Sequence, residues 1–197
     1  MPMHAGATGD GPARVGRRAV FVDRDGTLNP DLKYLADADR VEVFRGVAAG
    51  LKWLRDHGYL IVCVTNQSGV ERGFYRREDV DRIHERLNQR LADAGAHVDA
   101  FYYCPHAPEA GCACRKPGTL LFEQAEADWG IRFAQSAIVG DRALDVEAGE
   151  KLGLLTAVVM SPGHVEEVER ELQDRKVNPD IRALSFRGAA RRVLGRA

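Results

Sequence analysis

The sequence predicts an α/β fold built on a parallel sheet that helices cover on both faces. Short, continuous apolar runs, which are typical of strands buried on both sides, alternate with segments whose apolar residues recur at helical spacing. Acidic and amide side chains follow several of these runs directly. Because strands joined by helices run parallel, and ligands of such sheets collect at the carboxyl ends of the strands, we expect one domain with its functional site at that edge.

The first half of the chain is predicted to hold three strands and two helices. The apolar runs Ala19–Val22 and Tyr59–Asn66 are typical of buried strands. Between them, residues 46–58 place apolar side chains at helical spacing and stop at a glycine. Residues 76–95 carry a longer stripe of the same period, and Val98–Cys104 is the third strand candidate.

The second half resumes the alternation after a loop. Residues 104–118 show no apolar periodicity, so we expect no regular structure there. After this loop we expect two helix–strand pairs and a tail that adds a short strand and a closing helix. In order, these are a helix at 119–130, a strand at 136–141, a helix at 144–152, a strand at 154–160 and the tail at 179–194.

Composition agrees with a soluble globular domain. Of the 197 residues, 45% are hydrophobic and 29% are charged, and the formal net charge of −1 lacks the basic excess of a nucleic-acid binder. No apolar run reaches the length of about 18 residues that a membrane span needs. Residues 1–18 lack the apolar segment of a secretory signal. We therefore expect a disordered lead at 1–18, a single domain at 19–197, a cytoplasmic monomer, and no nucleic-acid or membrane partner.

Acidic residues follow two of the predicted strands and would converge at one edge of the sheet. Asp23 and Asp25 come directly after the first strand, and Asp141 follows the fourth, with Asp145 near it. A single aspartate after a strand is usually a cap or turn residue, but converging carboxylates repel one another unless a cation lies among them. An oxygen-only cluster prefers Mg²⁺, which commonly takes a substrate phosphate as a further ligand. The sequence therefore predicts a magnesium site for a phosphorylated substrate.

Other residues near the predicted strand ends suit a phosphate group. The turn Gly26–Thr27 can turn backbone amides toward an anion, and Thr65 with Asn66 supplies a hydroxyl and an amide. Lys116 supplies a positive charge. A solvated surface position is the usual fate of a lysine, but Lys116 directly follows a loop rich in cysteine, which favours a functional role.

Four segments in this order resemble the motifs of haloacid dehalogenase superfamily phosphatases. They are "DRDGT" after the first strand, "VTN" at the end of the second, Lys116, and "GDRALD" after the fourth. The resemblance covers about residues 19–160 and implies the Rossmann-like fold of that superfamily. Because residues 28–63, between the first two motifs, leave room for only one helix, we expect no large cap domain and an open site.

The resemblance also implies catalytic roles. Asp23 would be the nucleophile that forms an aspartyl-phosphate, and Asp25 the general acid and base. Two residues apart on an extended chain, their side chains would project to the same side, with Arg24 pointing the other way. Thr65 and Lys116 would hold the phosphoryl oxygens. The implied Mg²⁺ site consists of Asp23, the backbone carbonyl of Asp25, and Asp141, with Arg142 beside the metal.

A second metal site is predicted in the loop at 104–116. Thiolates and an imidazole select Zn²⁺ in a closed tetrahedral site, so the zinc would be structural and would fix the direction of Arg115 and Lys116. Unrelated buried cysteines and a surface histidine are the alternative, but four soft ligands within eleven residues argue against it. Cys63, in the middle of a predicted strand, is expected in the core. The four predicted ligands are Cys104, His106, Cys112 and Cys114.

A zinc loop of this kind is similar to those of phosphatases acting on D-glycero-D-manno-heptose 1,7-bisphosphate and of histidinol-phosphate phosphatases. The stretch "TNQSGVERGFY", with Arg72, resembles the heptose type, whereas the short loop is a length shared with the histidinol type. The resemblance implies hydrolysis of the 7-phosphate of this small phosphorylated sugar, with histidinol phosphate as the alternative substrate. Two further functions stay open, a phosphotransferase and a zinc-binding interaction module without catalysis.

The same resemblance implies the residues that bind the substrate. Asp31 to Tyr34 would line the sugar site, and Arg115 would recognise the substrate. The implied substrate-binding residues are Asp31, Leu32, Lys33, Tyr34, Thr65, Asn66, Gln67, Ser68, Arg115 and Lys116.

Overall fold

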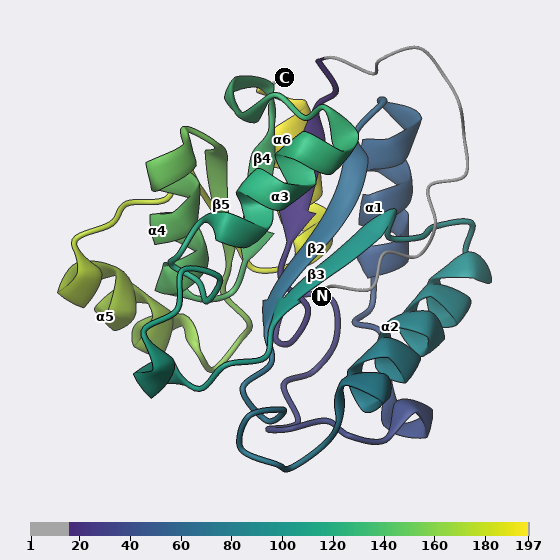
Figure 1. Ribbon diagram of the computed structural model, residues 1–197. Helices are drawn as coiled ribbons and strands as arrows, with labels where there is room; N and C mark the ends of the chain where they lie inside the picture. The colour runs from purple at the N-terminus through teal and green to yellow at the C-terminus, as the bar shows by residue number, and fades with distance from the viewer. Residues whose placement is uncertain (1–15, 197) are drawn as a thin grey trace.

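Six parallel strands form the central sheet in the computed structural model, which describes residues 16–196 (Figure 1). Their order is β3-β2-β1-β4-β5-β6, so the chain first adds strands on one side of β1 and then on the other. The parallel sheet is therefore confirmed, including the short strand in the tail. The bounds are β1 Ala19–Val22, β2 Leu60–Asn66, β3 Ala100–Cys104, β4 Ala137–Gly140, β5 Leu155–Val159 and β6 Ile181–Ala183.

Helices cover both faces of the sheet (Figure 1). Helices α1, α2 and α6 contribute to the apolar core on one face, and α3 and α4 to the core on the other. Helix α5 packs against α4 and β5. The bounds are α1 Val47–Asp56, α2 Arg77–Ala92, α3 Leu120–Trp129, α4 Ala143–Leu152, α5 Val165–Arg175 and α6 Phe186–Leu194.

The central strand β1 shows why its sequence is apolar without interruption. All four of its residues are buried, because successive side chains enter opposite cores. Val20 packs in the core under α1 and α6, whereas Phe21 packs on the α3 side, where its ring meets Phe122 edge to face with centroids 5.0 Å apart. Burial on both faces leaves no position for a polar residue until the strand ends at Val22.

The topology brings distant polar residues to one edge of the sheet. Val22 pairs with Cys63 on β2 and with Val139 on β4, so the chain leaves all three strands at the same edge. The strand order reverses between β1 and β4, and a crevice at such a point is where ligands of open α/β sheets bind. Asp23 and Asp141, the residues after β1 and β4, lie at this reversal.

Helix α5 is absent from the sequence prediction. Its residues are mostly charged, and only Val168 and Leu172 are buried. Together with Val165 they nevertheless recur at helical spacing, which is the signal that would have found the helix. None of the helices that residues 16–196 form has both the length and the apolar character that a membrane span requires.

The expected lead at 1–18 lies largely outside the described residues. Residues 16–18, which it included, pair with the fold: the amides of Gly16 and Arg17 donate to the carbonyl oxygen of Gly130, and Arg17 forms a parallel bridge with Ile131. These three residues therefore belong with the domain.

Candidate active site

A pocket of about 270 Å³ opens at the carboxyl edge of the sheet and gathers most of the predicted site residues. Leu32 and Lys33 do not line it, although they were predicted to. Leu35, Tyr75, Leu144 and Asp145 do line it and were not among the predicted site residues. The predicted residues that line it are Asp23, Asp25, Asp31, Tyr34, Thr65, Asn66, Gln67, Ser68, Arg115, Lys116, Asp141 and Arg142.

Lys116 is a buried cation in the floor of this pocket. Its side chain is 3% exposed, and its Nζ lies 2.9 Å from Oδ1 of Asp23 and 2.6 Å from Oδ1 of Asp145. It also donates to the carbonyl oxygen of Val64, at 2.7 Å. Burial alone would lower the pKa of Lys116, but the two carboxylates raise it above its ordinary value. Lys116 therefore stays charged, and a solvated surface position is excluded.

Three carboxylates cluster at this site, two of them in contact with the cation. Oxygens of Asp23, Asp141 and Asp145 all lie within 4.8 Å of one another. Burial, with the charge of Asp145, raises the pKa of Asp23 to about 6 against the opposing effect of Lys116. Burial and the charges of Asp23 and Asp145 raise the pKa of Asp141 well above its usual range. One ammonium thus leaves the cluster short of positive charge, which a hard divalent cation among oxygen ligands would supply.

Asp145 is a site residue that the sequence prediction placed only nearby. Its Oδ1 accepts from Lys116 and its Oδ2 from the amide of Arg142, at 3.1 Å, so both oxygens have partners within the protein. It is the third residue of α4, where a carboxylate caps the helix N-terminus. Asp145 therefore positions Lys116, and Asp141 is left as the carboxylate that faces Asp23.

Gly26 is required by the close approach of Asp141. A Cβ at this position would lie 2.1 Å from Oδ2 of Asp141, and its φ of +83° is in the left-handed region that favours glycine. The neighbouring hydroxyl of Thr27 donates to Oδ1 of Asp141, at 2.9 Å. The turn after β1 thus fixes the position of the Asp141 carboxylate, because Gly26 leaves space for it and Thr27 binds it.

Arg24 does not point away from Asp25, contrary to the prediction. The chain turns directly after Asp23, because the amides of Thr27, Leu28 and Asn29 all bond to the Arg24 carbonyl. The buried guanidinium then folds onto the next residue: Nε lies 3.1 Å from Oδ1 of Asp25, and Nη2 2.7 Å from Oδ2. Burial would raise the pKa of Asp25, but Arg24 and hydrogen bonds from Asn29 and Gln67 hold it below its usual value.

The end of β2 holds the backbone of Lys116. Oδ1 of Asn66 accepts from the Lys116 amide at 3.0 Å, and Nδ2 of Asn66 donates to the Lys116 carbonyl at 3.3 Å. Asn66, predicted as a substrate ligand, therefore uses its side chain to anchor the residue that carries the buried ammonium.

Tyr34, which lines the pocket, forms an exposed aromatic pair with Phe74. Tyr34 is 45% exposed and Phe74 is 56% exposed, and their rings meet edge to face with centroids 4.6 Å apart. Lys33 and Tyr34 both have positive φ, and Oδ1 of Asp31 accepts from the Lys33 amide at 3.0 Å. This conformation turns Asp31 and Tyr34 toward the pocket, while Leu32 and Lys33 are exposed outside it.

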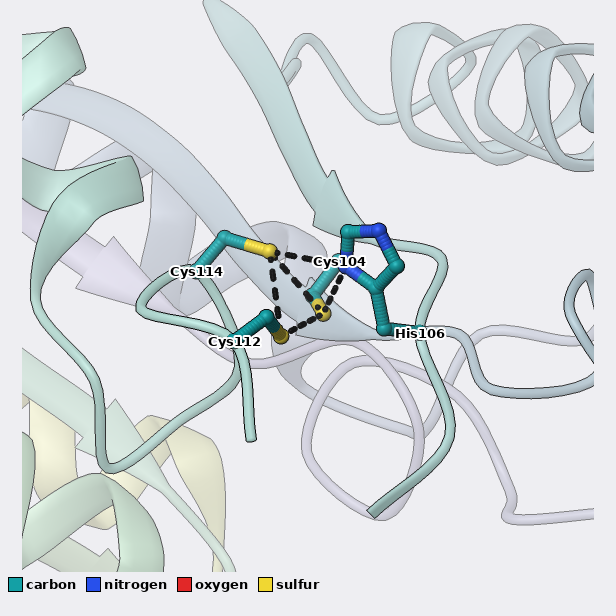
Figure 2. A group of neighbouring side chains, drawn as sticks. All are labelled: Cys104, His106, Cys112 and Cys114. Atoms are coloured by element: carbon teal, nitrogen blue, oxygen red, sulfur yellow. Dashed lines mark hydrogen bonds between the residues drawn. The ribbon is translucent and has the colours of Figure 1, made fainter. Parts of the chain in front are cut away.

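The predicted zinc ligands meet at the end of β3 (Figure 2). The three sulfur atoms lie 3.2 to 3.5 Å apart, and Nδ1 of His106 lies 3.2 Å from Sγ of Cys114 and 3.6 Å from Sγ of Cys104. These separations exceed the roughly 2.05 Å of a disulfide bond but are close to those expected around a tetrahedral ion with bonds of about 2.0–2.3 Å. The donor set therefore fits a metal ion, and Arg115 is tied to it by a 3.3 Å hydrogen bond to the His106 carbonyl.

A buried lysine between carboxylates, at the topological switch of a parallel sheet, suits phosphoryl transfer, and residues 113–186 match the HAD-hydrolase-like family model, so the class of protein is a hydrolase of the haloacid dehalogenase type. The chain is 42% identical over 164 residues to a D-glycero-beta-D-manno-heptose-1,7-bisphosphate 7-phosphatase of Haemophilus ducreyi, covering 80% of this chain and 90% of that protein. It is 40% identical over 143 residues to a probable D-glycero-D-manno-heptose-1,7-bisphosphate 7-phosphatase of Thermoplasma acidophilum, covering 72% and 89%.

A solved structure has the same architecture. The D,D-heptose 1,7-bisphosphate phosphatase of B. bronchiseptica, in complex with magnesium and phosphate, superimposes with a TM-score of 0.79 at 27% identity, over 91% of this chain and 99% of that one. The chain belongs to the family of haloacid dehalogenase-type phosphatases that contains these heptose-bisphosphate enzymes.

Proposed function

We propose that the protein hydrolyses the 7-phosphate of D-glycero-D-manno-heptose 1,7-bisphosphate through an aspartyl-phosphate on Asp23. The observation that carries the reaction type is the Asp23 carboxylate, held 2.9 Å from the buried ammonium of Lys116 and beside Asp141. The names of the relatives, at 42% and 40% identity, support the choice of sugar.

The residues of the pocket suit a two-step transfer. An oxygen of Asp23 would attack phosphorus while the bond from phosphorus to the sugar oxygen breaks. Asp25, which is ionised in the free pocket, would take up a proton when the phosphate ester binds, give it to that leaving oxygen, and later take one from the water that hydrolyses the aspartyl-phosphate. Lys116 and the hydroxyl of Thr65 would stabilise the charge on the phosphoryl oxygens.

The carboxylate cluster fits a magnesium ion. Asp23 and Asp141 would hold it, with the backbone carbonyl of Asp25 as a further ligand and Arg142 beside it. Bound Mg²⁺ would act as a Lewis acid on a phosphoryl oxygen. The raised pKa of both Asp23 and Asp141 supports this assignment, because these carboxylates lack compensating charge from the protein alone.

The cysteine and histidine cluster is assigned to one structural Zn²⁺. Four protein ligands complete a tetrahedron and leave no position for water. The ion would hold the loop that directs Arg115 and Lys116 toward the pocket. For the sugar we propose Asp31, Tyr34, Ser68 and Arg115, which line the outer pocket. We also propose that the enzyme acts as a cytoplasmic monomer.

Phosphate release distinguishes this function from a histidinol phosphatase and from a non-catalytic module. Purified protein with Mg²⁺ would be offered both anomers of the heptose bisphosphate and histidinol phosphate, and the position of the remaining phosphate would be read by NMR. We expect at least tenfold higher kcat/KM for the heptose substrate, with the 1-phosphate retained. A tenfold preference for histidinol phosphate would reverse the assignment, and no turnover of any phosphate ester would favour the non-catalytic module.

A further inference from the structure

Gln67 lies in the pocket wall with all its hydrogen-bonding capacity used inside the protein. Its Oε1 accepts from Nη2 of Arg24 at 3.0 Å and from the hydroxyl of Tyr75 at 2.8 Å. Its Nε2 donates to Oδ2 of Asp25 at 2.8 Å and to Oγ1 of Thr65 at 3.0 Å. A glutamine side chain offers two acceptor sites and two donors, so none is left for a substrate. The residue is also only 2% exposed.

The partners that hold Gln67 are themselves fixed. The ring of Tyr75 lies against Gly69, where a Cβ would come within 2.3 Å of it, so the glycine provides the space for the ring. Nη1 of Arg24 lies 3.3 Å from Nε2 of His84. Burial and the charge of Arg24 lower the pKa of His84 well below its usual value, so the imidazole is neutral and accepts this bond. A stacked Phe101, 4.3 Å away, holds the imidazole in place.

The amide of Gln67 therefore joins two groups to which the proposed reaction gives different roles. Asp25 would protonate the leaving oxygen, and Thr65 would face the phosphoryl oxygens. Since the Thr65 oxygen accepts from Gln67, its own hydrogen remains available to an oxygen in the pocket.

We propose that Gln67 is a positioning residue rather than a ligand of the sugar. Held in place by Tyr75 and Arg24, it orients the Asp25 carboxylate and the Thr65 hydroxyl for proton transfer to the leaving group. The inference rests on the proposed phosphatase reaction but not on the identity of the sugar. Its specific consequence concerns the leaving group. An alkoxide needs the proton from Asp25 as the ester bond breaks, whereas 4-nitrophenolate leaves without it.

Three substrates and three variants test the proposal. The variants are Gln67→Met, which keeps the length but removes the four bonds, Tyr75→Phe, which removes one of them, and Tyr59→Phe as the matched control at the far edge of the sheet. The substrates are the heptose bisphosphate, glycerol 3-phosphate as an alkyl ester without the heptose, and 4-nitrophenyl phosphate. Circular dichroism and thermal unfolding report whether each variant folds.

The quantity measured is the ratio of kcat/KM for glycerol 3-phosphate to kcat/KM for 4-nitrophenyl phosphate. We expect this ratio to fall about tenfold or more in Gln67→Met and about threefold in Tyr75→Phe, because proton transfer contributes about 10²–10⁴-fold to the rate. KM for the heptose bisphosphate should stay within about twofold, and Tyr59→Phe should change nothing. A raised KM for the heptose with unchanged kinetics on the other two esters would instead make Gln67 a sugar ligand and overturn the proposal.

An equal loss on every substrate would also overturn it, since a merely structural role has no leaving-group dependence. Failure of the proposed sugar assignment would look different. The wild type would then hydrolyse the two simple esters but not the heptose bisphosphate, and the ratio between the simple esters would still report on Gln67.

Discussion

At the residue scale, a few side chains have properties that their residue type does not predict. Lys116 is buried and permanently charged, Arg24 is the largest fully buried side chain of the described part of the chain, and Asp145 uses both oxygens internally. Each is tolerated because an opposite charge lies within hydrogen-bonding distance. The result is an electrostatic arrangement in which the Asp23 carboxylate lies 2.9 Å from the buried ammonium and close to Asp141.

Asp23→Asn is expected to abolish turnover. An amide is a poor nucleophile, and the substitution also removes the negative charge that Asp23 places beside Lys116. The value of kcat should therefore fall by about 10³-fold or more. Phosphate release from 4-nitrophenyl phosphate measures this, with Asp56→Asn, an exposed residue at the end of helix α1, as the matched control that keeps full activity. Retention of more than a few per cent of the wild-type rate would remove Asp23 from the nucleophile's role.

Gly26→Ala is expected to disable the metal site. The new Cβ would lie 2.1 Å from Oδ2 of Asp141 and would displace the carboxylate, so Mg²⁺-dependent activity should fall by about 10²-fold, the typical effect of about 1 Å of misplacement. Gly73→Ala is the control, because Gly73 also has positive φ but has open space around it. Equal losses in the two variants would attribute the effect to backbone strain alone.

At the scale of the elements, the site depends on the segment that comes directly after each strand. Strand β1 is followed by a tight turn that carries Asp23 to Gly26, β2 by the segment that carries Gln67, and β4 by the N-terminus of α4, where Asp145 caps the helix. The loop after β3 has one short 3₁₀ turn, at Pro108–Ala110, and otherwise no regular structure in the described chain. A bound metal ion would therefore stabilise the conformation of this loop more than it would stabilise a helix or strand, which backbone hydrogen bonds already hold.

Cys112→Ser is expected to lower activity while the fold persists. Loss of one thiolate should reduce the zinc content from about one ion per chain, and the freed loop should misdirect Arg115 and Lys116, at a cost of about 10²-fold in kcat/KM. Metal analysis, circular dichroism and phosphate release measure the three effects, and Cys63→Ala, a core residue of β2, should keep its zinc. Zinc-free protein with unchanged kinetics, or a variant that unfolds completely, would contradict a structural zinc.

At the scale of the whole molecule, the parallel sheet brings residues that are far apart in the sequence to one edge. Residues from the ends of β1, β2 and β4, together with the loop after β3, meet at one edge because every strand points the same way. The reversal of strand order between β1 and β4 opens the crevice between them. The carboxylate cluster there carries more negative charge than Lys116 can balance, so a bound cation would relieve the repulsion among its oxygens.

Mg²⁺ is therefore expected to stabilise the folded protein as well as to support activity. At 100 times its dissociation constant, a ligand of the folded state adds about 2.7 kcal/mol, which for a domain of this size raises Tm by several degrees, about 5–10 °C. Asp141→Asn should abolish most of this shift. Ca²⁺, which accepts more ligands at longer distances, should raise Tm but inhibit turnover. Full activity with Ca²⁺ alone, or no Tm shift with Mg²⁺, would contradict the site.

Much of the fold was predictable because its signals are local. The strand at Ala19–Val22 must be buried on both faces, and the helix at Val47–Asp56 has an apolar stripe, so periodicity alone located both. Helix α5 was missed because its few apolar residues lie among charges. The clustering of Cys104, His106, Cys112 and Cys114 was predictable because its signal is also local: the four residues lie within eleven positions of the sequence and are the residue types that bind zinc.

The sequence by itself determined which residues could carry the chemistry: paired acids after an apolar strand, one lysine beside a cysteine loop, and a glycine where the chain must turn. Only the tertiary structure decided which partner each of these side chains binds. Arg24 turns back onto Asp25, Asp145 belongs to Lys116, and Gln67 uses its amide on Asp25 and Thr65. The physical reason is that a side chain's type limits which hydrogen bonds and ion pairs it can make, whereas the partner it actually meets depends on where the folded strands deliver it.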